Sequence, residues 1–281
     1  MLTATDIRDL LQRHGLAPSK RLGQHFVIDH NTLRRMVSDA GVQAGDHVCE
    51  IGAGLGSLTV ALREAGATVS AIEVDSGLVR ALREVVGADS GVRIIHADVR
   101  TVDLVAEVPA PAIVVANLPY SIGTSVALDV LTTEHFDRAH VMVQREVGQR
   151  WTATVGDPQF GAVSIKVAAY AEARIMARVS RQAFYPVPGV DSVTVRLEPR
   201  PWPFNVPRGA VLALVEQGFT QRRKRLRNAL APRVPATAAD AALAAVGLRP
   251  DIRAEQVGLP EWCALASAVR APTLPLGDPA P

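Results

Sequence analysis

The sequence predicts an α/β protein, a doubly wound parallel sheet followed by a small all-α domain. Between about residues 45 and 150, short β-branched runs alternate with helical patterns, which is typical of parallel strands joined by crossover helices. The composition then shifts to proline over residues 199–207, which indicates a linker. Beyond it the chain is rich in alanine and leucine, so we expect a small helical domain there.

The individual elements follow from these patterns in chain order. Strands are expected at residues 47–51, 68–74, 92–96, 112–116 and 140–144, and helices at 57–64, 76–86, 121–131 and 146–152. A helix expected over 161–170 precedes strands at 173–179 and 192–197. No long helix separates these last two strands, so we expect a hairpin that closes the sheet.

The helical domain and the chain end complete the expected organisation. Helices are expected over 208–231, 238–245 and 259–268, and Thr237 is expected to cap the middle one. The tail after Arg270 is rich in proline and glycine, and we expect it to be disordered. The expected regions are a larger domain at 1–206 with an N-terminal helical extension, a helical domain at 207–270 and a tail at 271–281.

The composition limits the classes of protein to consider. With 281 residues, of which 48% are hydrophobic and 21% charged, the chain can build a substantial core. No apolar run approaches the roughly 18 residues of a membrane span, and the N-terminus lacks a signal-peptide core. Cys49 and Cys263 form no metal-ligand spacing. We therefore expect a cytoplasmic protein without a membrane segment or a metal, and a monomer by default.

A glycine-rich loop follows the first expected strand. Residues 52–56 read Gly-x-Gly-x-Gly, with Glu50 two positions upstream. Glycines let the backbone turn sharply and approach a ligand closely. Dinucleotide-binding loops have the different spacing Gly-x-Gly-x-x-Gly, whereas this loop resembles the first motif of S-adenosylmethionine-dependent methyltransferases. The cofactor of those enzymes carries an ammonium and a sulfonium group but no phosphate.

Two further acids follow successive strands. Glu73 lies at the end of the second expected strand, where a carboxylate can accept hydrogen bonds from both ribose hydroxyls. Asp98 follows the third strand, where a carboxylate could accept a hydrogen bond from the adenine amino group. Because ligands of open α/β sheets bind at the carboxyl ends of the strands, Glu50, Glu73 and Asp98 are expected along one cofactor site.

The segment Asn117-Leu118-Pro119-Tyr120 is the most informative part of the chain. It follows the apolar run 113–116, which reads as a buried parallel strand. Asn117 offers an amide oxygen, Pro119 stiffens the backbone, and Tyr120 offers a flat ring. These groups suit a planar base that carries an exocyclic amine.

Positive charge is concentrated locally, although the formal net charge is only +2. Residues 222–227 contain five cations in six positions, and Lys20-Arg21 adds a second pair. Such a run is compatible with a solvated helix face and equally with a patch that contacts nucleic-acid phosphates. The charge pattern alone leaves both interpretations open.

Taken together, these segments resemble the KsgA family of small-subunit rRNA adenine N6,N6-dimethyltransferases. The segments that carry the resemblance are 20–26, the glycine loop, Glu73, Asp98, 117–120, 184–192 and 219–228. The resemblance implies a Rossmann-like class I S-adenosylmethionine-dependent methyltransferase domain at 1–206 and an RNA-binding helical domain at 207–270.

The resemblance also implies an activity. The family transfers methyl groups from S-adenosylmethionine to N6 of two adjacent adenosines in a 3'-terminal hairpin of 16S rRNA in the 30S particle, and it also serves ribosome biogenesis. The family more often has Asn and Leu where this chain has His25 and Val27, so His25 is expected to contribute mainly through its backbone. The residues that match the family's cofactor contacts are His25, Val27, Gly52, Glu73, Asp98 and Asn117.

The expected chemistry centres on Asn117. Its amide oxygen and an adjacent backbone carbonyl would accept hydrogen bonds from adenine N6, Tyr120 would stack on the base, and Phe184 would cover another face or edge. No general base is needed, and in-line positioning is the main expected contribution. The residues expected to hold the RNA backbone are Arg222, Arg223, Lys224 and Arg227.

Other functions are compatible with parts of the sequence. A large-subunit rRNA adenine methyltransferase that gives macrolide resistance shares the sheet and a similar tetrapeptide, but segments 219–228 and 186–188 favour the small-subunit family. A DNA adenine methyltransferase would need a DNA-reading domain, which is not evident. A ribosome-assembly binding factor could tolerate loss of Glu73, Asp98 or Asn117, and all three are present. The glycine spacing disfavours a nicotinamide-dependent oxidoreductase.

Overall fold

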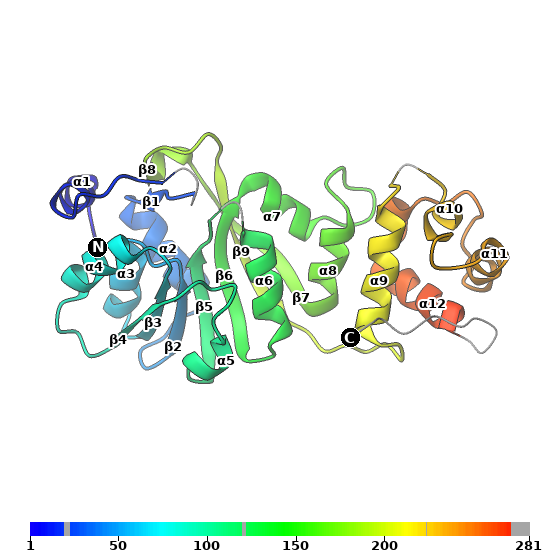
Figure 1. Cartoon of the computed structure of the whole chain (residues 1–281), viewed down its shortest axis with the longest axis horizontal. Helices are drawn as coiled ribbons and strands as arrows, with labels where there is room; N and C mark the ends of the chain where they lie inside the picture. Colours follow the sequence, from blue (N-terminus) through cyan, green and yellow to red (C-terminus); the bar gives the residue numbers. More distant parts are fainter. Residues whose placement is uncertain (20–22, 120–121, 223, 271–281) are drawn as a thin grey trace. The chain divides into compact units, whose positions relative to one another are not determined.

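The computed structural model describes residues 1–19, 23–119, 122–222 and 224–270, and Figure 1 shows its course. The chain divides into two compact units. The first consists of Met1–Gly148 and Glu172–Pro199, and the second consists of Gln149–Ala171 and the described residues from Arg200 onward. The tail expected to be disordered, 271–281, lies outside the described residues.

A sheet lies at the centre of the first unit (Figure 1), and within the described residues it has seven strands in the order β4-β3-β2-β5-β6-β9-β7. The neighbours from β4 to β6 pair in parallel, and β9 runs antiparallel to β6. The bounds are β2 His47–Ile51, β3 Thr68–Glu73, β4 Val92–His96, β5 Ala112–Asn117, β6 Phe136–Gln144, β7 Ala171–Val179 and β9 Ser192–Pro199.

The doubly wound sheet predicted from the alternating pattern is thus confirmed. The chain moves outward from β2 to β3 and β4, then returns to the other side of β2 with β5. The carboxyl ends of β2 and β5 therefore flank the point at which the winding reverses, where ligands of such sheets bind. The strands β7 and β9, predicted as a hairpin, are neighbours at one edge of the sheet.

Helices of the first unit bury apolar faces against this sheet. Leu33 of α2 and Leu62 of α3 are fully buried in one cluster with Val48, Val69 and Val115 from three adjacent strands. The helix α7 continues from the first unit into the second. The bounds are α1 Ala4–Arg13, α2 His30–Asp39, α3 Ser57–Glu64, α4 Ser76–Val86, α5 Leu104–Glu107, α6 Gly123–Thr132 and α7 Arg145–Thr152.

The first unit also contains a second, very short sheet. The strands β1 (Phe26–Val27) and β8 (Phe184–Tyr185) pair antiparallel, with Phe26 opposite Tyr185 and Val27 opposite Phe184. The 3₁₀-helix η1 (Arg181–Ala183) leads into β8. Two-residue strands carry too little apolar pattern to be recognised in sequence, so neither strand is among the predicted elements.

The second unit is all-helical in its described part apart from one isolated β-bridge and the first residue of β7. Trp262 is fully buried at its centre, in a cluster with Phe160, Ile165 and Leu226. The bounds are α8 Ala162–Tyr170, α9 Arg208–Phe219, α10 Leu226–Leu230, α11 Ala236–Ala245, the 3₁₀-helix η2 Ala254–Gln256, and α12 Leu259–Arg270.

The two compact units do not meet at the boundary expected from the sequence, between residues 206 and 207. Residues 149–171 belong to the helical unit, and that unit resumes at Arg200. The reason is tertiary: Ile165 and Ala169 of α8 are buried in the same cluster as Val211 and Leu214 of α9. From the sequence alone α8 is assigned to the domain that contains the sheet, because α8 lies between two strands in the sequence.

The single helix predicted over 208–231 is wrong. The helix α9 ends at Phe219, and α10 begins only at Leu226. The Leu226 amide donates to the Ile252 carbonyl at 2.7 Å, which ties the start of α10 to a residue distant in sequence. Arg225 also forms a β-bridge with Arg253. Thr237 is not an N-cap either, since α11 begins at Ala236 and Pro235 precedes it.

Candidate active site

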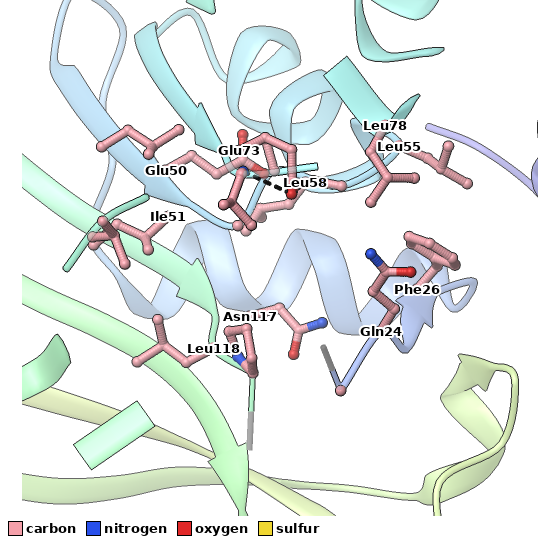
Figure 2. Close-up of a pocket in the computed structure, with 18 of the residues that line it drawn as sticks. Gln24, Phe26, Glu50, Ile51, Leu55, Leu58, Glu73, Leu78, Asn117 and Leu118 are labelled. Atoms are coloured by element: carbon pink, nitrogen blue, oxygen red, sulfur yellow. Dashed lines mark hydrogen bonds between the residues drawn. The ribbon is translucent and has the colours of Figure 1, made fainter. Parts of the chain in front are cut away.

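A cavity of about 290 Å³ opens at the carboxyl ends of β2, β3, β4 and β5. Figure 2 shows Glu50 and Glu73 on one side of it, Asn117 and Leu118 on the opposite side, and Gln24 and Phe26 between these groups at one end. The six residues that match the family's cofactor contacts all line this cavity: His25, Val27, Gly52, Glu73, Asp98 and Asn117. The fold thus brings together residues separated by up to 92 positions.

The glycine loop requires glycine for two distinct reasons. Gly54 has φ +58° and Gly56 has φ +92°, a left-handed backbone region that side chains disfavour. A Cβ on Gly54 would lie 3.3 Å from Cε1 of Phe26, and one on Gly56 would lie 2.7 Å from Cδ1 of Leu82. The loop can therefore pass close to its neighbours only without side chains.

Glu73 binds the glycine loop from the end of β3. Its Oε2 accepts a hydrogen bond from the Gly54 amide at 2.8 Å, and its Oε1 accepts from the Val74 and Asp75 amides at 2.9 Å each. Burial raises the pKa of Glu73, while these three backbone donors act in the opposite direction. The carboxylate therefore fixes the conformation of the glycine loop.

Glu50 is a buried acid at the floor of the cavity. It is 1% exposed, and its Oε2 accepts a hydrogen bond of 2.6 Å from the Thr59 hydroxyl. Burial, with a contribution from the charge of Glu73, raises the pKa of Glu50 to about 8. No ion pair of Glu50 is found within the described ranges. A cationic group placed beside a buried carboxyl of this kind would stabilise its ionised form.

Asp98 is held by a neighbouring guanidinium. Nε of Arg100 donates to Oδ1 and Oδ2 of Asp98 at 3.0 and 3.1 Å, and Nη2 donates to Oδ2 at 2.5 Å. These bonds lower the pKa of Asp98 to about 2, so it is an ionised acceptor at any ordinary pH. Arg100 lines the same cavity, although no sequence pattern marks it as a site residue.

The orientation of the Asn117 amide is fixed by a backbone carbonyl. Nδ2 of Asn117 lies 3.0 Å from the carbonyl oxygen of His25. Because a carbonyl oxygen can only accept, the amino group must face it, and Oδ1 is the amide atom left for a ligand. Asn117 therefore presents an acceptor at the end of β5, as the sequence predicts.

The side chains of Gln24 and His25 form hydrogen bonds that connect their segment to other parts of the first unit. Gln24 accepts from the Ser19 amide at 2.8 Å and donates to Oδ2 of Asp75 at 3.3 Å. Nδ1 of His25 lies 2.7 Å from the Pro186 carbonyl oxygen. Gln24 belongs to segment 20–26, so the family motif marks its position, but the sequence does not reveal that it joins these two groups.

Phe184 does not line the cavity in this structure. Its side chain is 1% exposed and packs in the core cluster with Val27 and Met142. The Phe184 ring supports β8 from the core, and its contact with a base stays a prediction. Tyr120, the predicted stacking residue, lies outside the described residues, as do Lys20 and Arg21.

The described part of the basic segment lies in the second unit: Arg222, Lys224 and Arg225 follow α9, and Arg227 lies in α10. Arg222 pairs with Glu255 at 2.7 Å, and Arg227 pairs with Asp240 at 3.1 Å. No ion pair of Lys224 is found in the part of the chain that the structure describes, and Arg223 lies outside that part. Of the described residues, Arg222, Lys224 and Arg225 lie outside α9 and α10, so the solvated-helix interpretation does not apply to these three.

Neither a metal site nor a membrane span is found among the described residues. No group of three or more His, Cys, Asp or Glu side chains there is arranged to hold a metal ion. No helix in the same ranges is long and apolar enough to cross a membrane. Cys49 and Cys263 are both buried and free.

The chain is similar over nearly its whole length to known sequences. Residues 17–270 match the family model for ribosomal RNA adenine dimethylase. A protein of Leifsonia xyli subsp. xyli named ribosomal RNA small subunit methyltransferase A is 45% identical over 278 residues, which cover 95% of this chain and 98% of the relative. A protein of the same name from Streptomyces griseus subsp. griseus is 42% identical, with 95% and 94% covered.

Solved structures show the same fold. A dimethyladenosine transferase from Plasmodium falciparum superimposes with a TM-score of 0.77 at 22% identity, covering 89% of this chain and 99% of the other. The 23S rRNA methyltransferase ErmE gives a TM-score of 0.68 at 26% identity, covering 86% and 98%. These likenesses agree with the predicted class I methyltransferase architecture.

Proposed function

The chain belongs to the ribosomal RNA adenine dimethylase family, and from this premise we propose its specific reaction. It transfers methyl groups from S-adenosylmethionine to N6 of two adjacent adenosines in a 3'-terminal hairpin of 16S rRNA. The product is N6,N6-dimethyladenosine, and the substrate is the rRNA within the small ribosomal subunit. We propose further that the protein acts in the cytoplasm as a monomer and contributes to ribosome biogenesis.

The observation that carries this proposal is the orientation of Asn117. Its Nδ2 is committed to the His25 carbonyl, so its Oδ1 is available to accept a hydrogen bond from an amine. The same cavity holds the acids Glu50, Glu73 and Asp98. An amine acceptor and a set of cofactor-binding acids in one cavity are what methyl transfer to an exocyclic amine requires.

The acids of the cavity fit the groups of S-adenosylmethionine, which supplies a methyl group on a sulfonium centre. Glu50, buried without an ion pair among the described residues, would gain a cationic partner from the amino-acid part. Glu73 would accept from the ribose hydroxyls, and Asp98 from the adenine amino group. Gly52, His25 and Val27 would form the walls, as their place around the cavity suggests.

The chain's own contribution to the chemistry is to activate and position adenine N6. That nitrogen is a weak nucleophile because its lone pair is delocalised into the ring. Hydrogen bonds from its two N–H groups to Asn117 Oδ1 and to a backbone carbonyl would favour a pyramidal nitrogen and localise the pair. Alignment of reacting groups can supply roughly 7–11 kcal/mol, and stacking on Tyr120 about 1–3 kcal/mol.

The target adenosine must leave its base stack to reach this cavity. We propose that Arg222, Arg223, Lys224 and Arg227 hold the RNA backbone while the base is extruded. Contacts of this kind to phosphates position the RNA without reading its sequence, so selection of the adenosines would rest on the shape and accessibility of the hairpin.

A large-subunit substrate is the second candidate, since ErmE shares the fold. The small-subunit assignment is favoured because the similar bacterial sequences at 38–45% identity are named for the small subunit. The test is to incubate the protein with labelled S-adenosylmethionine and either unmethylated 30S subunits or 23S rRNA, then to digest the RNA and identify the nucleosides. N6,N6-dimethyladenosine from 30S subunits alone supports the proposal, and label in 23S rRNA alone contradicts it.

A further inference from the structure

The short sheet of β1 and β8 continues beyond its two paired residues on each strand. Its register places Phe26 opposite Tyr185 and Val27 opposite Phe184. In the same register the Ile28 amide donates to the Ala183 carbonyl at 2.8 Å. The residue in the next position toward the cavity is His25, and it faces Pro186.

Proline interrupts the backbone ladder at this step. Pro186 has no amide hydrogen, so it cannot donate to His25 as another residue could. The His25 side chain bonds at the same step to the acceptor that proline keeps: Nδ1 lies 2.7 Å from the Pro186 carbonyl oxygen. Because that oxygen can only accept, Nδ1 carries the proton, and this fixes which ring nitrogen donates.

The same residue also contacts Asn117. The backbone carbonyl of His25 accepts the hydrogen bond from Asn117 Nδ2 at 3.0 Å. His25 therefore connects two segments that lie far apart in sequence, the end of β5 and the segment that follows β8. A sheet of two-residue strands is marginal by itself, so the side-chain bond of His25 adds a contact that this sheet needs.

We propose that the His25 imidazole is a positioning residue for methyl transfer: through Nδ1 it fixes the segment after β8 relative to Asn117, and so sets the geometry of the adenine site. This inference rests on the proposed function. It differs from the expectation that His25 contributes mainly through its backbone. The side chain acts on the base side, and the cofactor can bind without it.

The position of the donor atom distinguishes three substitutions. Nδ1 of histidine and Nδ2 of asparagine are both attached to Cγ, so asparagine can present an N–H group at the same place. Glutamine carries its amide one bond further out, and phenylalanine has no donor. His25→Asn is therefore the rescuing variant, His25→Phe removes the bond, and His25→Gln misplaces the donor.

The experiment compares these three variants with the wild type. The dissociation constant of S-adenosylmethionine is measured by calorimetry, and the single-turnover rate is measured on unmethylated 30S subunits with saturating cofactor. We expect His25→Phe and His25→Gln to lower the rate about 10- to 100-fold. The dissociation constant should change less than about threefold for every variant, a shift worth well under 1 kcal/mol, and His25→Asn should approach the wild-type rate.

A matched control comes from His30. Its Nε2 also contacts a backbone carbonyl, that of Leu2 at 3.0 Å, and His30 does not line the cavity. His30→Phe should leave the rate unchanged. A His25→Phe protein with the wild-type rate, or one whose defect is entirely in cofactor affinity, would overturn the inference. If the wild type itself methylates no 30S adenosine, the proposed function fails instead, so the two failures are distinct.

Discussion

The Gly54 amide donates a hydrogen bond of 2.8 Å to Oε2 of Glu73, so the acid that ends β3 also holds the glycine loop that follows β2. The cofactor site is therefore not a set of independent contacts. A change at Glu73 would alter the loop as well as the ribose contact that we propose for this residue. Because of this hydrogen bond, a change at Glu73 should also change the free energy of unfolding of the protein without cofactor.

For Glu73, we expect Glu73→Ala to weaken both cofactor binding and the fold. Removal of the carboxylate leaves the Gly54, Val74 and Asp75 amides without their acceptor, at a cost of about 1–3 kcal/mol per buried group. Glu73→Gln keeps one acceptor oxygen and should be less destabilised. Thermal unfolding without cofactor and calorimetry with S-adenosylmethionine check this. An alanine variant with unchanged melting temperature would show that the carboxylate does not brace the loop.

The pH dependence of stability tests Glu50. Its pKa is raised from an ordinary value of 4.5 to about 8 in the folded protein, so the folded state keeps a proton that the unfolded state has released. The free energy of unfolding should therefore fall as the pH rises from about 5 to 8, by on the order of 3 kcal/mol from this residue.

The control for Glu50 is Glu50→Gln, which keeps the shape and does not titrate. Urea unfolding at several pH values should show that the wild type is destabilised relative to Glu50→Gln between pH 5 and 8. S-adenosylmethionine should offset this destabilisation of the wild type at pH 8, because its ammonium group would pair with the ionised carboxylate. Parallel pH curves for the two proteins would contradict the raised pKa.

Asn117→Ala should nearly abolish methyl transfer while affecting cofactor affinity less than Glu73→Ala does. The activity falls because Oδ1 is the acceptor assigned to adenine N6. Asn117→Asp is a sharper variant: it keeps oxygen acceptors but has no N–H group for the His25 carbonyl, so we expect it also to be inactive. Methyl incorporation into 30S subunits and calorimetric cofactor affinity are the measurements. If Asn117→Ala incorporates methyl groups at the wild-type level, Oδ1 of Asn117 is not the acceptor for adenine N6.

Charge reversal tests the basic segment. Replacing Arg222, Arg223 and Lys224 with Glu should weaken RNA binding and flatten the plot of log affinity against log salt, by roughly 0.7–0.9 for each phosphate that is no longer neutralised. A variant with the same net charge, in which three exposed arginines of the first unit are replaced, serves as control: Arg34→Glu, Arg80→Glu and Arg178→Glu. Equal slopes for the two triple variants would mean that only overall charge matters.

The sequence by itself determined the sheet and much of the site. Strand patterns are local, since a buried parallel strand is a short β-branched run, and the strands predicted at 47–51 and 92–96 match β2 and β4. Glu73, Asp98 and Asn117 end or directly follow their strands, so their place at one edge of the sheet required only the parallel arrangement.

Tertiary structure decided the features that depend on distant partners. The Leu226 amide, at the first residue of α10, pairs with the Ile252 carbonyl, and no local pattern encodes this contact. Ile165 and Ala169 of α8 pack in the helical core. The Asn117 amide is oriented by a carbonyl 92 positions away, and the His25 imidazole meets Pro186 across 161 positions. A side-chain amide or imidazole can donate or accept, and the sequence does not say which partner it will meet. Only the folded chain brings the partner close, and the partner then decides which atom donates.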